Sequence, residues 1–129
     1  MSPGYIEFLS LLGMTEEEVQ KLMVSLAPPI PNPEVDSAFV LGPSPISGYG
    51  LLSRREILAG ERFPVCRGPT RYLTARYINH SDTPNTIFDF DPANGNGWMT
   101  ALCNLPAGFE VTVDYRDNFR KSTATPPQG

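Results

Sequence analysis

The first 26 residues carry apolar positions at helical spacing, interrupted by one glycine. Residues 5–12 (YIEFLSLL) are mostly apolar, and Gly13 follows them, where a helix commonly ends in a left-handed residue. Thr15 and Glu18 then form a Thr-x-x-Glu capping box. The apolar positions behind this box are Val19, Leu22, Met23 and Leu26. The pattern predicts two short helices. We expect the apolar face of the second to pack on the rest of the chain, rather than to contact a second copy or another partner.

A proline-rich segment separates these helices from a stretch of short apolar runs and turns. Residues 27–33 (APPIPNP) favour neither helix nor central strand, so they predict an extended linker. Beyond the linker, strands are predicted at 38–41, 87–90, 98–103 and 110–115. The last of these alternates polar and apolar residues, which is typical of a half-buried strand. The core should therefore be mostly β.

Two segments of this stretch resemble each other. Residues 57–61 read ILAGE and residues 105–110 read LPAGFE, so each has an apolar residue, then x-Ala-Gly, with a glutamate close behind. In both, the glycine would take the positive φ that a tight turn between strands requires. The echo predicts two similar β units packed together.

Length and composition indicate one small domain. The chain has 129 residues, 40% of them apolar, and no run approaches the roughly 20 apolar residues of a membrane span. The N-terminus lacks the basic, apolar and small-residue succession of a secretory signal, so we expect an intracellular, reducing compartment. The expected parts are a helical appendage with linker at 1–33, a main domain at 34–120 and a disordered tail at 121–129.

Charge and cysteine content argue against two classes of function. The net charge is −4, whereas a broad nucleic-acid-binding face needs a positive field. A positively charged partner suits this charge, though weakly. Cys66 and Cys103 could pair, but two cysteines make no disulfide framework, and without a Cys-x-x-Cys pair we expect no zinc.

Single residues with chemical potential are ambiguous when each is taken alone. His80 is the only histidine and stands in RYINHSDTPN (76–85). With no second histidine for a metal and no Gly-x-Ser-x-Gly for a hydrolase, it favours a histidine that holds a turn. The Gly-Tyr-Gly at 48–50 is a turn, or a place where backbone approaches a ligand closely. Tyr115 alone indicates a ring in the core with its hydroxyl at the edge.

Taken in order, four blocks resemble the SET-domain protein lysine methyltransferases. They are Gly-Tyr-Gly-Leu-Leu at 48–52, Leu-Ala-Gly-Glu at 58–61, Arg-Tyr-Ile-Asn-His-Ser-x-x-Pro-Asn at 76–85, and Ala-Leu-x-x-Leu-Pro-Ala-Gly-x-Glu-Val-Thr-Val-Asp-Tyr at 101–115. The resemblance covers about residues 38–119 and leaves the N-terminal helices outside. It implies the SET-domain β-clip of short strands, in which the C-terminal strand threads past the Asn-His-Ser segment to make a pseudoknot.

The resemblance also implies a function and a set of site residues. The cofactor would be S-adenosylmethionine, and the methyl acceptors would be lysine side chains of a protein or peptide, held as an added strand. Tyr115 would be the catalytic residue. Asn79 and His80 would contact the cofactor through side-chain amide and backbone, and Phe119 would cover its adenine. The implied cofactor-binding residues are Gly48, Tyr49, Gly50, Tyr77, Asn79, His80, Tyr115 and Phe119.

The chain departs from this family at three places. Residues 62–78 are shorter than the family's insert that walls the lysine channel, so the N-terminal helices, or a second subunit in a homodimer, would complete the groove. Val113 stands where many members carry an aromatic residue that limits the number of methyl groups, and Phe109 replaces the first glutamate of Gly-Glu-Glu. Two other functions stay open: a catalytically weak SET-like module that recognises a protein partner, and a small all-β structural protein.

Overall fold

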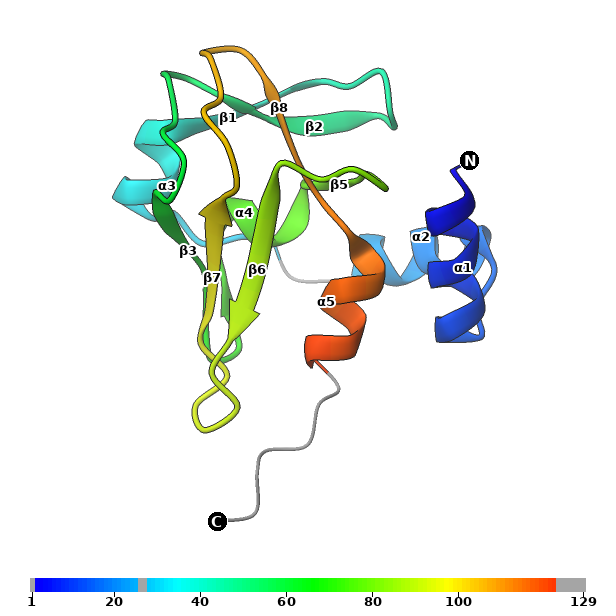
Figure 1. Cartoon of the computed structure of the whole chain (residues 1–129). Coiled ribbons are helices and arrows are strands. Elements are labelled where there is room, and N and C mark those ends of the chain that lie inside the picture. The colour runs from blue at the N-terminus through cyan, green and yellow to red at the C-terminus, as the bar shows by residue number, and fades with distance from the viewer. Residues whose placement is uncertain (1, 26–27, 123–129) are drawn as a thin grey trace.

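Two four-stranded sheets form the centre of the molecule (Figure 1). The structure is a computed structural model that describes residues 2–25 and 28–122. The strands are β1 (Phe39–Pro43), β2 (Tyr49–Ser53), β3 (Arg62–Arg67), β4 (Thr70–Arg71), β5 (Asn79–His80), β6 (Thr86–Phe90), β7 (Gly97–Ala101) and β8 (Glu110–Val113). One sheet has the order β1-β2-β8-β5 and the other β4-β3-β7-β6. Neighbours are antiparallel except β5 and β8, which run parallel. The predicted β-rich core is confirmed.

The two sequence echoes form a pseudo-symmetric pair. β2 pairs with β8 through Leu51 and Val111, and β7 pairs with β3 through Met99 and Phe63, so equivalent residues lie 48 positions apart. The turn glycines Gly60 and Gly108 have φ values of 88° and 87°. Gly60 N–H donates to Ala101 O, at the end of β7, at 2.8 Å, and Gly108 N–H donates to Ser53 O, at the end of β2, at 2.7 Å. The prediction of two similar β units, joined by glycine turns, is therefore confirmed.

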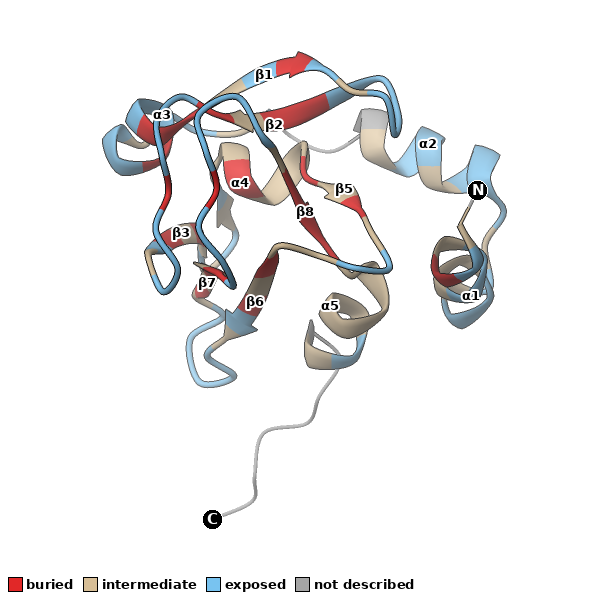
Figure 2. Cartoon of the chain, turned by 45° about the horizontal axis from the view of Figure 1, so that its top comes forward, coloured by how far each residue is buried: buried red, intermediate tan, exposed pale blue. Residues whose placement is uncertain are grey.

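Side chains from both sheets share one hydrophobic cluster. Phe39 of the first sheet and Phe63 of the second meet edge to face, with ring centroids 4.8 Å apart. The largest apolar side chains with less than 2% exposure are Phe39, Leu51, Ile57, Met99, Val35, Val111 and Val113. Each such side chain contributes roughly 1.5–3 kcal/mol by leaving water. Much of this buried centre lies on the strands of the two sheets (Figure 2).

The two N-terminal helices lie to one side of the sheets (Figure 1). They are α1 (Pro3–Leu12) and α2 (Glu16–Ser25). Gly13 ends α1 with φ 66°, and Thr15 and Glu18 exchange N–H hydrogen bonds at 3.1 and 3.2 Å, so both predicted caps are confirmed. α1 contacts the C-terminal helix, whereas no described side chain of α2 is buried. Within 2–25 and 28–122, no helix is long and apolar enough to cross a membrane.

Three short helices were not predicted: α3 (Pro33–Ala38), α4 (Leu73–Arg76) and α5 (Tyr115–Ser122). The predicted linker therefore ends earlier than expected, because Asn32 accepts hydrogen bonds from Glu34 N and Val35 N and caps α3, with Pro33 at its first position. The strand expected from residue 38 begins at Phe39. Residues 26–27 of the linker region lie outside the described residues.

The C-terminal strand is shorter than its alternating pattern predicts. β8 ends at Val113, and Tyr115 is the first residue of α5 rather than the end of a strand. Asp114 explains the change, because its Oδ1 accepts the Arg116 N–H at 2.9 Å and caps the helix. The predicted tail begins inside α5, since Lys121 and Ser122 are helical, and its remainder, 123–129, lies outside the described residues.

Candidate functional site

Six of the eight predicted cofactor residues line one cavity, which we call cavity A. These six are Gly48, Tyr49, Tyr77, Asn79, His80 and Tyr115, and the cavity measures about 780 Å³. Pockets for small ligands and cofactors typically measure about 300–1,000 Å³, so its size is suitable for a nucleoside-containing cofactor. α1 and α2 complete its wall, with Tyr5, Val19 and Met23 among the lining residues. The apolar face of α2 is thus turned towards cavity A.

The Gly-Tyr-Gly turn contributes two residues to cavity A and one to its support. Gly48 has φ 42° and Tyr49 is 66% exposed on the cavity rim. Gly50 is buried and does not line the cavity. A Cβ at Gly50 would overlap the Glu110 carboxylate and lie 3.1 Å from Ser44 Cβ. The second glycine is needed because Glu110 approaches the backbone there.

The side-chain amide of Asn79 fixes this turn by hydrogen bonds, an arrangement that we call the Asn79 latch. Its Nδ2 lies 2.8 Å from Glu110 Oε2, 3.2 Å from Ser47 O and 3.1 Å from Tyr49 O. Glu110 also accepts the Ser44 hydroxyl at 2.7 Å. The amide N–H groups of Asn79 are therefore directed to the protein, although the resemblance implied that the side-chain amide contacts the cofactor. The structure gives Asn79 the role of fixing the turn that borders cavity A.

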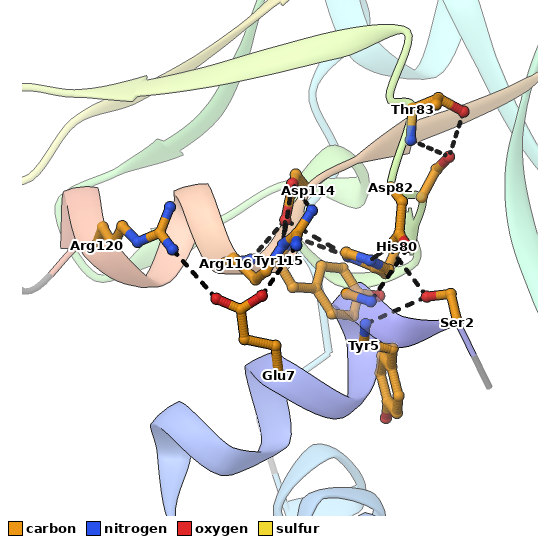
Figure 3. Close-up of polar contacts among 12 residues, drawn as sticks. Ser2, Tyr5, Glu7, His80, Asp82, Thr83, Asp114, Tyr115, Arg116 and Arg120 are labelled. Atoms are coloured by element: carbon orange, nitrogen blue, oxygen red, sulfur yellow. Dashed lines mark hydrogen bonds and ion pairs between the residues drawn. The ribbon is translucent and has the colours of Figure 1, made fainter.

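His80, the last residue of β5, is buried and connects the loop that contains Asp82 to the start of α5. Its Nδ1 accepts the Tyr115 N–H at 3.0 Å, and its Nε2 lies 2.6 Å from Asp82 Oδ1 (Figure 3). Because Nδ1 is an acceptor, the ring proton is on Nε2 and is donated to Asp82. This hydrogen bond is the largest cause that lowers the Asp82 pKa from its ordinary value. With both ring nitrogens engaged, His80 is a structural connector, and the interpretation of it as neither base nor nucleophile fits this geometry.

Tyr115 is oriented from both ends. Its backbone N–H is held by His80, and its hydroxyl donates to Ile78 O at 2.6 Å. Burial is the largest cause that raises the pKa of this phenol, followed by the nearby Tyr5 and Glu110. The hydroxyl is therefore protonated near neutral pH, and one lone pair can still accept a weak C–H···O contact.

A second cavity, which we call cavity B, meets the first at Tyr115. It measures about 1110 Å³ and lies between the β3–β4 hairpin, β6, α5 and α1. Its aromatic lining residues are Phe8, Phe88, Phe90, Tyr115 and Phe119, and its acidic ones are Asp89 and Asp91. Tyr115 and Phe8 line both cavities. Tyr115 therefore stands where the two spaces adjoin.

Phe119 is separated from the other predicted cofactor residues. Tyr115 and Phe119 are four residues apart on one face of α5, and Phe119 lines cavity B but not cavity A. The resemblance implied that Phe119 covers the adenine of the cofactor. Since Phe119 lines cavity B rather than cavity A, this role stays a prediction.

Several site residues were missed by the sequence reasoning. Asp82 accepts a hydrogen bond from His80, and Glu110 accepts one from Asn79. Tyr5 and Phe8 of α1 contact the Tyr115 ring. Asp82 had a signal, since it follows His80 by two residues. The helix residues had none, because they contact Tyr115 only through the tertiary fold.

In the described part of the chain, no group of three or more His, Cys, Asp and Glu side chains could hold a metal ion. Cys66, half-buried, and Cys103, exposed, are both free thiols. The expectation that the protein uses no zinc stays a prediction.

Comparisons with known proteins agree with the architecture. The family model of the SET domain matches residues 66–116, a range that includes Tyr77, Asn79, His80 and Tyr115. No curated protein sequence matches significantly. A Plasmodium falciparum protein assigned as a histone methyltransferase aligns with 60% of this chain and 96% of its own, at 19% identity and a TM-score of 0.48.

One solved structure with a TM-score above 0.5 supports the fold. A humanized mutant of the Chaetomium thermophilum Polycomb Repressive Complex 2, bound to an inhibitor, aligns with 64% of this chain and 15% of its own. The identity is 22% and the TM-score 0.51, which is a likeness of fold. Residues 66–116 match the family model of the SET domain, and the arrangement of the two sheets is consistent with the SET fold.

Proposed function

We propose that this protein transfers methyl groups from S-adenosylmethionine to lysine side chains of a protein substrate. One observation carries the proposal: Tyr115 lines both cavities, and five other predicted cofactor residues share cavity A with it. When bound, the cofactor supplies an electrophilic methyl group on a sulfonium. Cavity A has the size and the motif residues to hold that cofactor.

The two cavities suit an in-line displacement. A nucleophile must approach the methyl from the side opposite the leaving sulfur, at about 3–3.5 Å. The cofactor would lie in cavity A and the acceptor lysine would enter through cavity B. Phe88 and Phe90 wall cavity B, and a lysine ammonium can rest against aromatic faces on its way in. Desolvation by the apolar walls would lower the pKa of the lysine and favour the neutral amine that has a lone pair, while Asp89 and Asp91 of the same cavity would favour the cation as it enters.

Tyr115 would orient the reacting groups rather than take a proton. Its hydroxyl is held by Ile78 O and its pKa is raised, so it remains protonated. Its oxygen can accept a weak C–H···O contact from the methyl group. The parallel pairing of β8 with β5 beside Tyr115 also supports the predicted pseudoknot, which would fix this hydroxyl in the fold.

A catalytically weak binding module is the second candidate. One observation favours it: the Asn79 amide nitrogen and the ring nitrogens of His80 are already engaged within the protein. Fewer polar side chains are then available to a cofactor than the SET motifs suggest. In this case the protein would recognise a partner with little or no methyl transfer.

Two measurements separate these functions. Calorimetry with S-adenosylmethionine should show one site, and absence of heat at high protein concentration would refute cofactor use. Transfer of radiolabelled methyl into lysate proteins, located on lysine by mass spectrometry, should accompany binding; binding without transfer would favour the module. Tyr115→Phe should reduce turnover and leave cofactor affinity nearly intact. Unchanged turnover would remove Tyr115 from the catalytic role.

A further inference from the structure

The N-terminal turn of α1 is fastened to the loop that follows His80. Ser2 Oγ donates to Asp82 Oδ1 at 3.0 Å, and Gly4 N donates to Asp82 Oδ2 at 3.1 Å. The first N–H groups of a helix have no partner within the helix and carry a partial positive charge, so a carboxylate is stabilised there. Asp82 is thus held by a segment 78 residues away in sequence.

Gly4 is the residue that permits this approach. It is buried, and an added Cβ would overlap the Asp82 carboxylate and lie 2.9 Å from Arg116 Cζ. Any larger side chain must therefore displace either α1 or Asp82. A second anchor reinforces the first, because Glu7 of α1 pairs with Arg116 of α5 at 3.1 Å.

The contact continues from Asp82 to Tyr115 through His80. Asp82 accepts a hydrogen bond from Nε2–H of His80, so Nδ1 carries no proton and accepts a hydrogen bond from the N–H of Tyr115. That N–H belongs to the first turn of α5 and has no acceptor within its own helix. The orientation of one imidazole therefore connects the start of α1 with the start of α5 (Figure 3).

Two aromatic side chains of α1 also enclose the Tyr115 ring. Phe8 meets it edge to face, with centroids 5.1 Å apart, and Tyr5 lies at 6.1 Å from both Tyr115 and His80. Such aromatic pairs contribute about 0.5–1.5 kcal/mol beyond their buried area and restrict ring orientation. The ring and the backbone of Tyr115 are both fixed from α1.

We infer that α1 is a positioning element of the methyl-transfer site: its first turn fixes Tyr115 through Asp82 and His80, while Tyr5 and Phe8 hold the ring. The effect of α1 on catalysis rests on the proposed function. The coupling of α1 to Tyr115 through Asp82 and His80 does not. The appendage outside the matched SET segment then belongs to the working site. Its residues Tyr5 and Phe8 form part of the wall of cavity A.

The coupling can be measured without any cofactor, because His80 is the only histidine. In ¹⁵N spectra of the imidazole, the wild-type protein should show a protonated Nε2 and an unprotonated Nδ1. Gly4→Ala should alter this state, giving shifted signals or a mixture of tautomers. Ser10→Ala, on the exposed face of the same helix, is the matched control and should leave the spectrum unchanged. An unaltered imidazole in folded Gly4→Ala protein would overturn the inference.

Kinetics then test the catalytic consequence. Gly4 lines neither cavity, so Gly4→Ala should reduce kcat at least about tenfold, while the cofactor Kd changes less than about threefold. Equal losses in kcat and affinity, or none, would overturn the positioning role. If Gly4→Ala does not fold, Glu7→Gln can replace it, because Glu7 also lies outside both cavities. Glu7→Gln should alter the imidazole spectrum and reduce kcat in the same way but by less. Absence of both effects would count against the inference. A wild-type protein without methyl transfer would refute the proposed function, and the imidazole spectra would still decide the coupling.

Discussion

Replacing Asn79 with aspartate would turn the donor that latches the Gly-Tyr-Gly turn into an acceptor of the same size. Asn79 Nδ2 lies 2.8 Å from Glu110 Oε2, so Asn79→Asp places two carboxylates at that separation. With an effective dielectric constant near 20, two full charges at this distance repel by about 6 kcal/mol. The turn at 46–49, which borders cavity A, would lose its anchor.

Uptake of a proton limits this penalty and makes it depend on pH. Protonating a carboxyl group of ordinary pKa, about 4.3, costs about 3.7 kcal/mol at pH 7 and about 1 kcal/mol at pH 5. Because both costs are below the repulsion, the pair shares a proton at either pH. We expect Asn79→Asp to lower the free energy of unfolding by up to about 4 kcal/mol at pH 7, but by only about 1 kcal/mol at pH 5.

Urea unfolding at the two pH values, followed by the fluorescence of Trp98, measures the difference. Glu110→Gln in the same chain is the matched partner, since its amide can donate to the carboxylate introduced by Asn79→Asp and no second charge remains. The double variant should recover most of the stability lost at pH 7. An equal loss of unfolding free energy at pH 7 and pH 5, or no recovery in the double variant, would refute the role of the Asn79–Glu110 hydrogen bond.

Three further predictions follow from local chemistry. The hydrogen bond from His80 lowers the pKa of Asp82 below its ordinary 3.8. The contribution of the Asp82 carboxylate to stability is therefore complete above about pH 4 and is lost as the pH falls further. Asp82→Asn should flatten the acid dependence of urea unfolding, and an unchanged profile would contradict this. Gly60→Ala and Gly108→Ala should each cost about 1–2 kcal/mol, since both glycines have positive φ and nothing lies within 4 Å of an added Cβ; clearly unequal losses would speak against the pseudo-symmetric turns. The raised pKa of Tyr115 predicts that its phenol stays protonated at pH 11 while the protein is folded, so wild type and Tyr115→Phe should give the same native absorbance change at 295 nm.

Local signals predicted much of the scaffold. The capping box at Thr15 and the two glycine turns depend on interactions within a few residues, so their chemistry is visible in the sequence. The echo between 57–61 and 105–110 also predicted paired units, because the same short pattern closes the same turn twice. The order of the four blocks then placed most of the cavity A residues.

Competing local signals caused the errors. Residues 110–115 alternate like a strand, yet Asp114 caps a helix, and the cap prevailed over the pattern from Tyr115 onwards. Asn32 before Pro33 carries a helix-start signal that the surrounding prolines obscured. The docking of Gly4 on Asp82 could not be predicted, because it joins residues that only the tertiary fold brings together.

We propose that the methyl group of the bound cofactor lies beside Tyr115 in cavity A. The most direct measurement adds S-adenosylmethionine carrying a ¹³C-labelled methyl group to the full chain and records ¹³C-filtered nuclear Overhauser effects from that methyl. The structure predicts cross-peaks to the ring protons of Tyr115, since this ring adjoins the motif residues of cavity A. Saturated binding without cross-peaks to Tyr115, or no binding at all, would contradict this placement of the cofactor.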